Sequence, residues 1–335
     1  MQKAISTTSS SFYTLLRMIK TIRYHARLAQ EWDEFVGKAR NSTLLHLRNY
    51  MDYHSDRFQD ASLLFYDERQ HLVALLPACI SRKDSHTVVS HEGLTYGGLL
   101  TEPLTHTFVI EQALDAAMLY YKEELQASQL VIKHIPYIYS SQPADEELYF
   151  IHSRGGSLTA RGLSQTIDLT RPLPLNTLRQ RCLSRAAKAQ LEVRIATQRE
   201  EWDQYHSILT KCVARHGFAP VHSADELWML HTRFPQQIVL YATFRKESLI
   251  AGAVLYISPN VAHAQYLAVS DEGKQCGALD LAIHTAVHDP RIKQCRYFDF
   301  GISTERDGTL NHGLTLQKEG FGARGICYDI YQIPL

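Results

Sequence analysis

The sequence lacks an excess of charge of either sign, a run of about 20 apolar residues and any pair of cysteines at CxxC spacing. Its 335 residues hold 35 Lys plus Arg against 35 Asp plus Glu. The balanced charge argues against a globally basic nucleic-acid module, so no DNA partner is expected. The missing apolar run predicts no membrane-spanning helix. Six scattered cysteines indicate free thiols in a reducing cytosol rather than a disulfide scaffold.

The sequence also lacks the short motifs of three common classes. It has no Gly-x-Ser-x-Gly elbow and no GxxxxGK[ST] loop, and no GxGxxG follows a predicted strand. These absences exclude the standard hydrolase, P-loop and Rossmann interpretations. His284 and His288 lie four residues apart on a predicted helix, but Thr285 stands where zinc proteases have Glu. We therefore predict no metal site.

The length bounds the number of domains. A chain of 335 residues that is 45% hydrophobic is long enough for two domains of ~150 residues each. Residues 1–17 are rich in Ser and Thr and are predicted to form a disordered N-terminal extension. We place the first domain at 18–165 and the second at 166–335, because turn-forming residues occupy 154–157.

An internal repeat indicates two copies of one unit. The pattern Glu-Trp-Asp-x-aromatic occurs at 31–35 and again at 201–205. Each copy lies in an amphipathic helical pattern and precedes two apolar runs that are separated by a charged four-residue turn. Such paired runs predict a hairpin in each half. The predicted hairpin strands are 63–66 with 72–78, and 238–244 with 249–257.

The remaining elements follow the same order in both halves. After the hairpin come a third strand, a helix and a last strand, at 87–91, 105–126 and 130–135 and at 261–268, 277–288 and 297–300. This order predicts an α/β fold of the mixed α+β kind, in which each domain is a twisted mixed sheet flanked by helices.

Motifs near the C-terminus resemble a known family. Residues 298–301 read FDFG, Asn311, Gly313 and Leu314 follow, and residues 318–322 read KEGFG. This order resembles the FemAB-like branch of the GNAT superfamily, whose members carry two tandem GNAT-like domains. Gln317 departs from the Phe of that family. The resemblance covers most of residues 20–332. It implies a cytoplasmic bacterial acyltransferase that moves an acyl or aminoacyl group onto an amine of a cell-envelope or polysaccharide precursor.

The resemblance implies acyl-CoA as the donor. In the GNAT fold a splayed strand pair accepts the pantetheine arm, and a helix N-terminus accepts the pyrophosphate. The corresponding loop is 270–278, a degraded match to the GNAT pattern: Lys274 stands where the family prefers Gln or Arg, Gly277 is present, and Leu279 replaces Gly or Ala. Acidic residues at 271–272 would repel a pyrophosphate, so charged tRNA stays open as the donor.

A predicted helix at 175–190 carries Arg181, Arg185 and Lys188 on one face. One interpretation is a solvated charged face. The other is a donor or phosphate-binding site, because the run RCLSRAAKA at 181–189 resembles the basic helix that opens the second FemAB domain.

The glycine-rich stretch 91–98 is the candidate acceptor loop. Closely spaced glycines let the backbone approach a ligand or another chain segment. An ordinary turn is the alternative. In FemAB-like enzymes the acceptor lies between the two domains and this stretch would border it, so we predict acceptor contacts from His91, Tyr96, Gly97, Gly98 and Asn311.

Two charged residues are the candidate catalytic groups. Asp299 ends an apolar strand, where an unpaired carboxylate would be costly to bury. Lys318 precedes a Gly-Phe-Gly turn, and the family resemblance makes it a contact to the acceptor phosphate or the developing oxyanion. A structural ion pair between the two is the alternative interpretation.

Three functions stay open at this point. The first is the acyltransferase, with a small-molecule or lipid-linked sugar as acceptor. The second is a non-catalytic ligand-binding protein that kept the fold and lost the donor site. The third is an aminoacyl-tRNA-dependent peptidoglycan ligase of FemAB type, which would need charged tRNA as a partner.

Overall fold

The computed structural model describes residues 19–215 and 217–335, so the predicted extension at 1–17 lies outside the described residues. The described part of the first half contains eight short strands, the long strand β9 and four α-helices. They are β1 (Lys20–Arg23), α2 (Ala29–Val36), α3 (Arg48–Met51), β2 (Gln59–Asp60), β3 (Leu63–Tyr66), β4 (Leu72–Leu76), β5 (Cys79–Ile80), β6 (Thr87–Val89), β7 (Leu100–Thr101), α4 (Thr107–Leu125), β8 (Gln129–Lys133), α5 (Glu146–Ser153) and the long β9 (Ser157–Asp168).

The second half repeats the pattern with longer strands. Its elements are α6 (Thr177–Lys188), β10 (Glu192–Ile195), α7 (Arg199–Ala214), α8 (Ala224–Arg233), β11 (Ile238–Arg245), β12 (Ser248–Ile257), β13 (Val261–Val269), α9 (Asp271–Cys276), α10 (Ala278–His288), β14 (Tyr297–Ile302), α11 (His312–Glu319) and β15 (Arg324–Pro334).

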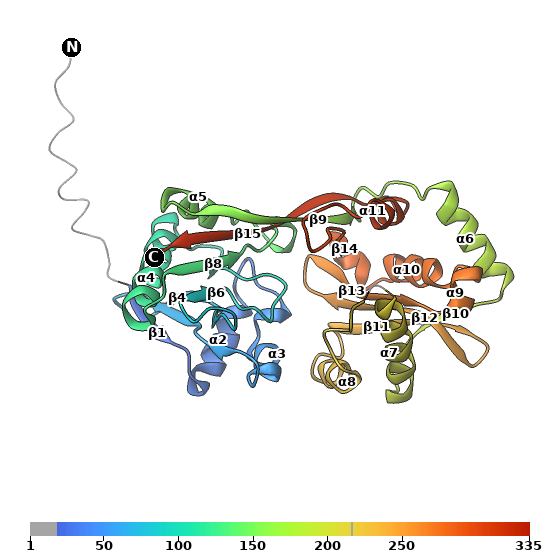
Figure 1. Ribbon diagram of the computed structural model, residues 1–335, viewed down its shortest axis with the longest axis horizontal. Helices are drawn as coiled ribbons and strands as arrows, with labels where there is room; N and C mark the ends of the chain where they lie inside the picture. The colour runs from blue at the N-terminus through green and yellow to red at the C-terminus, as the bar shows by residue number, and fades with distance from the viewer. Residues whose placement is uncertain (1–18, 216) are drawn as a thin grey trace, which may run out of the picture.

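Two long strands join the halves, as Figure 1 shows along one edge of the molecule. The larger sheet has the order β10-β11-β12-β13-β14-β9-β15-β8-β6-β5-β2, and β1, β3, β4 and β7 form a separate sheet. β15 pairs with β9 over residues 324–332 and with β8 over residues 330–334. The end of the chain therefore returns to the first half, and the predicted boundary after residue 165 falls inside β9.

The predicted order of elements is present in both halves. β1, α2, β3, β4, β6, α4 and β8 correspond in order to β10, α7, β11, β12, β13, α10 and β14. Both predicted hairpins form as antiparallel pairs, β3 with β4 and β11 with β12. Their turns contain Gln70 and Lys246, whose φ angles of 61° and 55° are left-handed. The fold is thus the mixed α/β arrangement that the sequence predicts.

The repeated tryptophans have the same structural role. Trp32 in α2 and Trp202 in α7 are both fully buried. A buried indole N–H needs an acceptor, and the two Nε1 atoms donate to the carbonyl oxygens of His46 at 2.7 Å and Ala196 at 3.3 Å. Each tryptophan therefore fixes its helix to the preceding or following loop of its own half.

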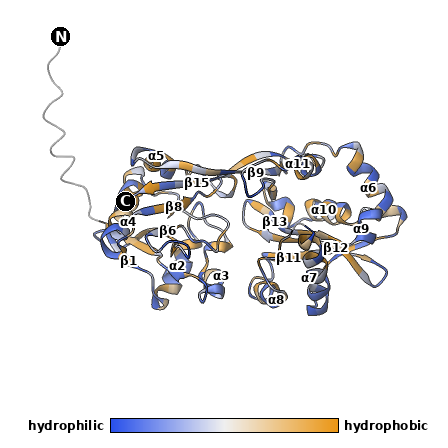
Figure 2. Ribbon diagram, in the orientation of Figure 1, coloured by the Kyte–Doolittle hydropathy of each residue, from blue (hydrophilic) through white to orange (hydrophobic). Residues whose placement is uncertain are grey.

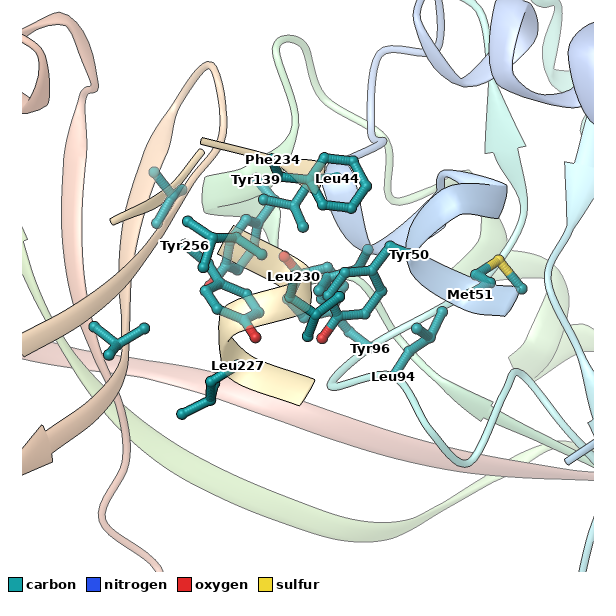
Figure 3. Packing of buried hydrophobic residues seen from close by; sticks show 14 of the residues in the cluster. Leu44, Tyr50, Met51, Leu94, Tyr96, Tyr139, Leu227, Leu230, Phe234 and Tyr256 are labelled. Atoms are coloured by element: carbon teal, nitrogen blue, oxygen red, sulfur yellow. The ribbon is translucent and has the colours of Figure 1, made fainter. Parts of the chain in front are cut away.

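Three apolar clusters hold the molecule together. One lies under α4 in the first half, and another lies between α10 and the sheet in the second half. Figure 2 shows the hydrophobic residues along β11 and β12. The third cluster joins the halves: Figure 3 shows Leu44 and Tyr50 of the first half packed with Leu230 and Tyr256 of the second. Among the described residues, no helix has both the length and the apolar character to cross a bilayer.

Candidate functional site

The central feature of the second half is a parallel strand pair that opens. β13 and β14 stay in register for three residue pairs, and the last of them joins His263 to Asp299. Gln265 is an extra residue in the pairing of β13 with β12, since Tyr266 pairs with Val254 and Ala264 pairs with Leu255. Such a bulge bends a strand. The backbone edges beyond His263 and Asp299 therefore separate.

Asp299 is the centre of a buried hydrogen-bond network. Its side chain is fully buried. A buried carboxylate is tolerated only when donors compensate for its lost hydration. Five side chains contact its two oxygens: Ser164 at 2.5 Å, His263 at 2.7 Å, Thr166 at 2.8 Å, Tyr328 at 2.8 Å and Tyr139 at 3.3 Å. Residues of both halves and of both joining strands thus converge on one carboxylate.

The network fixes the charge of Asp299 and the orientation of His263. Burial by itself raises the pKa of Asp299, but the hydrogen bond and charge of His263, with the hydroxyl donors, outweigh burial and hold the pKa at about 2. A proton on His263 Nδ1 directed at this carboxylate leaves Nε2 as the imidazole acceptor. A histidine oriented in this way by a carboxylate can act as a general base.

His263 faces a large cavity between the halves. The cavity has a volume of about 820 Å³. Its walls are the edges of β13 and β14, the loop 304–308, the middle of β9 and β15, and the end of β8. The side chain of His263 is 14% exposed. The Asp299–His263 pair is therefore buried on the carboxylate side and accessible on the imidazole side, as acid–base chemistry on a bound ligand requires.

The first half contributes positive charge to this cavity. Burial by itself lowers the pKa of His134, but hydrogen bonds to Asp145 and Glu147 outweigh burial and raise the pKa to about 9. Its Nδ1 lies 3.1 Å from Glu147 Oε2. Burial lowers the pKa of the neighbouring Lys133 to about 8, and the Lys133 ammonium donates to the carbonyls of Glu92 and Leu94. Both side chains line the cavity.

The predicted catalytic residue Lys318 lies beside the network rather than in it. Its side chain is buried, and its ammonium donates to the carbonyls of Gly301 at 2.7 Å and Ile302 at 3.0 Å and to Ser303 Oγ at 2.8 Å. Burial lowers its pKa to about 8, and the charge of Asp299 acts in the opposite direction. Lys318 therefore holds the turn that ends β14, where Gly301 has a φ of 75°.

The predicted acceptor loop packs inside the first half. His91 is 3% exposed and its ring stacks on His54, with ring centroids 5.3 Å apart. Tyr96 is 4% exposed and donates to Thr43 Oγ1 at 3.3 Å. Neither side chain lines the large cavity. Thr95, which precedes Tyr96 in the sequence, does line it.

The glycines of this loop serve close packing. A Cβ on Gly97 would lie 2.5 Å from the Ser90 carbonyl oxygen, and one on Gly98 would lie 2.6 Å from a Glu147 carboxylate oxygen. Closely spaced glycines can let the backbone approach a ligand or another chain segment. In this structure they let it approach another chain segment. Asn311 lies apart from the loop as the N-cap of α11, where its Oδ1 accepts from the Leu314 amide at 2.8 Å.

The predicted pyrophosphate site is covered. Gly277 precedes α10, but a Cβ there would lie 2.3 Å from the carbonyl oxygen of Cys182 in α6. Arg179 of α6 also pairs with Asp280 in the first turn of α10, at 2.7 Å. Lys274 is exposed and lies 3.8 Å from Asp271. Helix α6 thus occupies the place where the sequence predicts the phosphates.

The basic face of α6 points to solvent. Arg181, Arg185 and Lys188 are exposed, while Cys182 and Ala186 are buried on the opposite side. The three cations form no ion pair with any residue that the structure describes, and none of them lines the large cavity. Their predicted phosphate contact stays a prediction. His284 and His288 stack at 4.2 Å, and the described part of the chain contains no cluster fit to hold a metal.

Sequence reasoning singled out Asp299 but none of the residues that the structure places around it. His263, Tyr139 and Tyr328 come from three different elements, and no short motif links them. The available signal was a histidine in the third strand of the second half, which a parallel pairing with the FDFG strand would have placed next to Asp299.

Comparison with known proteins agrees with this geometry. Residues 176–307 match the family model described as an acetyltransferase (GNAT) domain. No curated protein matches the sequence. Among solved structures the chain is similar to FemX, with a TM-score of 0.67 at 12% identity over 94% of this chain and 97% of that chain.

Two further structures show the same architecture. One is the C-terminal domain of a putative lysylphosphatidylglycerol synthetase from Agrobacterium fabrum, with a TM-score of 0.59 at 13% identity over 92% and 91% of the two chains. The other is a tandem GNAT protein from the clavulanic acid biosynthesis pathway, with a TM-score of 0.53 at 11% identity over 94% and 98%. Identities this low carry the fold and no more. The chain has a GNAT/FemAB-like fold, in which the GNAT-like unit occurs twice in one chain.

Proposed function

We propose that the protein transfers an acyl or aminoacyl group to an amine bound in the cavity between the halves, with His263 as the general base. The observation that carries this proposal is the Asp299–His263 pair, which lies where β13 and β14 separate and which opens onto that cavity. The separated strand edges offer unpaired backbone groups to a donor, and the cavity offers room for an acceptor.

The reaction needs one base, one leaving group and one proton path. The acceptor amine attacks the acyl carbonyl carbon while its proton passes to His263 Nε2. The bond from that carbon to the sulfur or oxygen of the donor then breaks, and the imidazolium returns the proton to the leaving group. Asp299 stabilises the imidazolium, and backbone N–H groups of β13 beyond His263 are placed to stabilise the oxyanion. Lys318 and Asp299 are positioning residues in this scheme.

The acceptor class follows from the family resemblance and from the cavity. A cell-envelope or polysaccharide precursor carrying an amine stays our proposed acceptor. His134 is already paired with Glu147. Lys133 and Arg306, however, line the cavity and form no ion pair with a residue that the structure describes, so these two cations support an acceptor that also carries an anionic group. A lipid-linked sugar or a free amino sugar phosphate would each satisfy this chemistry.

The proposal is tested with a donor that carries no phosphate. The N-acetylcysteamine thioester of acetate presents the acyl group and the end of a pantetheine arm, so it does not need the covered loop at 270–278. We expect free thiol to be released faster when an amino sugar phosphate is added, and an N-acylated product to be found by mass spectrometry. The proposal would be contradicted if no added amine changed the rate of thiol release and no acylated product formed.

A second candidate is favoured by one observation, the burial of the α10 N-terminus by α6. It removes the usual pyrophosphate site of CoA, while the basic face of α6 stays open. A charged tRNA as aminoacyl donor fits both facts, because a polyanion can bind an exposed basic face. Transfer from charged tRNA that weakens in Arg185→Ala/Lys188→Ala, but not in Lys211→Ala on α7, would select this donor. Stabilisation by ligands without turnover of either donor would select a binding protein.

A further inference from the structure

A second, much smaller cavity adjoins the large one at His263. It shares Thr95, His263 and Gln265 with the large cavity and then extends between the halves. Its volume, measured as the space open to the centre of a water molecule, is only about 10 Å³. That is room for one water or one methyl-sized group. Because His263 is part of its wall, a group in the small cavity lies beside the imidazole.

The walls of this small cavity come from both halves and include Thr43 and Ser258 beside apolar side chains. Leu44 and Leu45 lie on one side, and the rings of Tyr96, Tyr139 and Tyr256 lie on the others. Figure 3 shows four of these residues, Leu44, Tyr96, Tyr139 and Tyr256, within the cluster that joins the halves. The atoms that face the space are almost all carbon. Such walls favour a small apolar group and disfavour a charged or hydrogen-bonding one.

The walls are also held in place. The Tyr139 hydroxyl lies 2.8 Å from that of Tyr328, which donates to Asp299. The Tyr96 hydroxyl donates to Thr43 Oγ1, and the Tyr96 and Tyr139 rings pack with centroids 4.4 Å apart. Leu44 is 7% exposed within the joining cluster. Close-packed walls of this kind do not expand to accept extra methylenes without cost.

We propose that this small cavity is the acyl-group pocket and that it limits the donor to acyl groups with a short, uncharged side chain or tail, such as the methyl group of acetyl or alanyl. The inference rests on the proposed transfer reaction and narrows its substrate class. The methyl group of the acyl moiety occupies the small cavity, and the carbonyl carbon lies at its mouth beside His263. Butyryl and longer chains do not fit, and a lysyl side chain would bury its ammonium without a partner.

The experiment measures the donor length profile of the full chain. Acetyl, propionyl, butyryl and hexanoyl thioesters of N-acetylcysteamine are compared with one amine, and alanyl-tRNA is compared with leucyl- and lysyl-tRNA. One methylene too many in an apolar pocket changes kcat/KM by about 10- to 200-fold. We expect acetyl to exceed butyryl by at least that factor, and alanyl to exceed leucyl and lysyl.

Two variants separate the pocket from general damage. Leu44→Ala enlarges the small cavity and should raise the butyryl-to-acetyl ratio of kcat/KM by about 10-fold or more. Leu230→Ala is the matched control, because Leu230 belongs to the same cluster and does not line the small cavity. Thr95→Phe narrows the mouth and should slow even the acetyl donor, and Thr95 is exposed, so the variant should fold.

The possible failures are distinguishable. If neither thioesters nor charged tRNAs donate to an amine, the proposed function fails and this inference falls with it. If transfer occurs but hexanoyl reacts as fast as acetyl, or if Leu44→Ala and Leu230→Ala give the same length profile, the transfer reaction stands and the acyl pocket is refuted.

Discussion

The two halves share one order of elements but differ at a matched position, the last residue pair at which their parallel strands stay in register. In the first half, β6 and β8 stay in register as far as Val89 and Val131. In the second half, β13 and β14 stay in register as far as His263 and Asp299. Two valines can only pack, whereas a histidine and a carboxylate can move a proton. The same position of the scaffold thus holds a pair suited to proton transfer in one copy and a packing pair in the other.

The halves also differ in what fills the space beyond that pair. In the first half the chain folds back: the Gly97 amide donates to the Lys133 carbonyl at 2.7 Å, and Ser90 Oγ accepts from the Lys133 amide at 2.8 Å. In the second half the strand edges line the large cavity. In the proposed function the first half is therefore a wall of the site, and the second half supplies the general base.

The largest expected effect comes from replacing His263, the residue that distinguishes the second half from the first at the matched position. His263→Gln should lower kcat/KM for amine acylation by about 10²- to 10⁴-fold, because the general base is lost. The thermal midpoint should change little, since Gln can still donate to Asp299. His288→Gln, on the exposed side of α10, is the control. A variant at position 263 with wild-type turnover would show that the chemistry does not reside in the second half.

The next effect concerns the charged wall of the first half. The pKa of His134 is raised from 6.5 to about 9 by its carboxylate partners. Its contribution to stability is therefore fully present below pH 6.5 and is lost as the pH rises through 9. With about 1.4 kcal/mol per pKa unit, His134→Gln should destabilise the fold on the order of 3 kcal/mol at pH 7 and hardly at all at pH 10.

Urea unfolding from pH 7 to pH 10 measures this difference between wild type and variant. The range avoids the titration of buried His46, whose pKa burial lowers to about 4 and whose contribution is lost only as the pH falls below 6.5. Lys133 titrates in both proteins, so its effect cancels in the difference. A destabilisation that stays constant across the range would mean that His134 is not charged in the folded state.

The smallest effect sharpens the structural role of the first-half loop. Gly97→Ala places a Cβ 2.5 Å from a backbone oxygen, and such overpacking costs about 1–3 kcal/mol. Gly313→Ala, whose Cβ would meet nothing closer than 3.6 Å, should be neutral or stabilising. Both variants should keep the wild-type acyl length profile. A Gly97→Ala protein of normal stability with weaker acceptor binding would instead restore the loop as an acceptor site.

Much of the fold was predictable because its helices and strands depend on residue patterns within short stretches of sequence. The hairpin strands, the helices and the repeated tryptophans follow from periodicity within short windows, and the structure has them at nearly the predicted positions. The crossing of β15 into the first half was not predictable in this way. Its pairing with β8 joins distant segments, and neither strand records the identity of its partner in its own sequence.

The site was predictable only in part, for the same reason. Asp299 was found because a carboxylate at the end of an apolar strand needs partners. His263 was missed because its meaning depends on the parallel register with β14. The amine of Lys318 was expected at the substrate, but the turn at 301–303 takes all three of its hydrogen bonds. The packing of α6 over Gly277 depends on tertiary contacts that no motif encodes.

The position of β15 has a consequence for how the protein is made. Its pairing with β8 connects segments roughly 200 positions apart, a separation that slows folding. The first half cannot complete its sheet while it emerges from the ribosome, because residues 324–334 are translated long after the rest of that half. Until then the outer edge of β8 stays open to wrong partners. The first half should therefore reach its native state only after residues 324–334 have been made, in a step that pairs β15 with β8 and with β9.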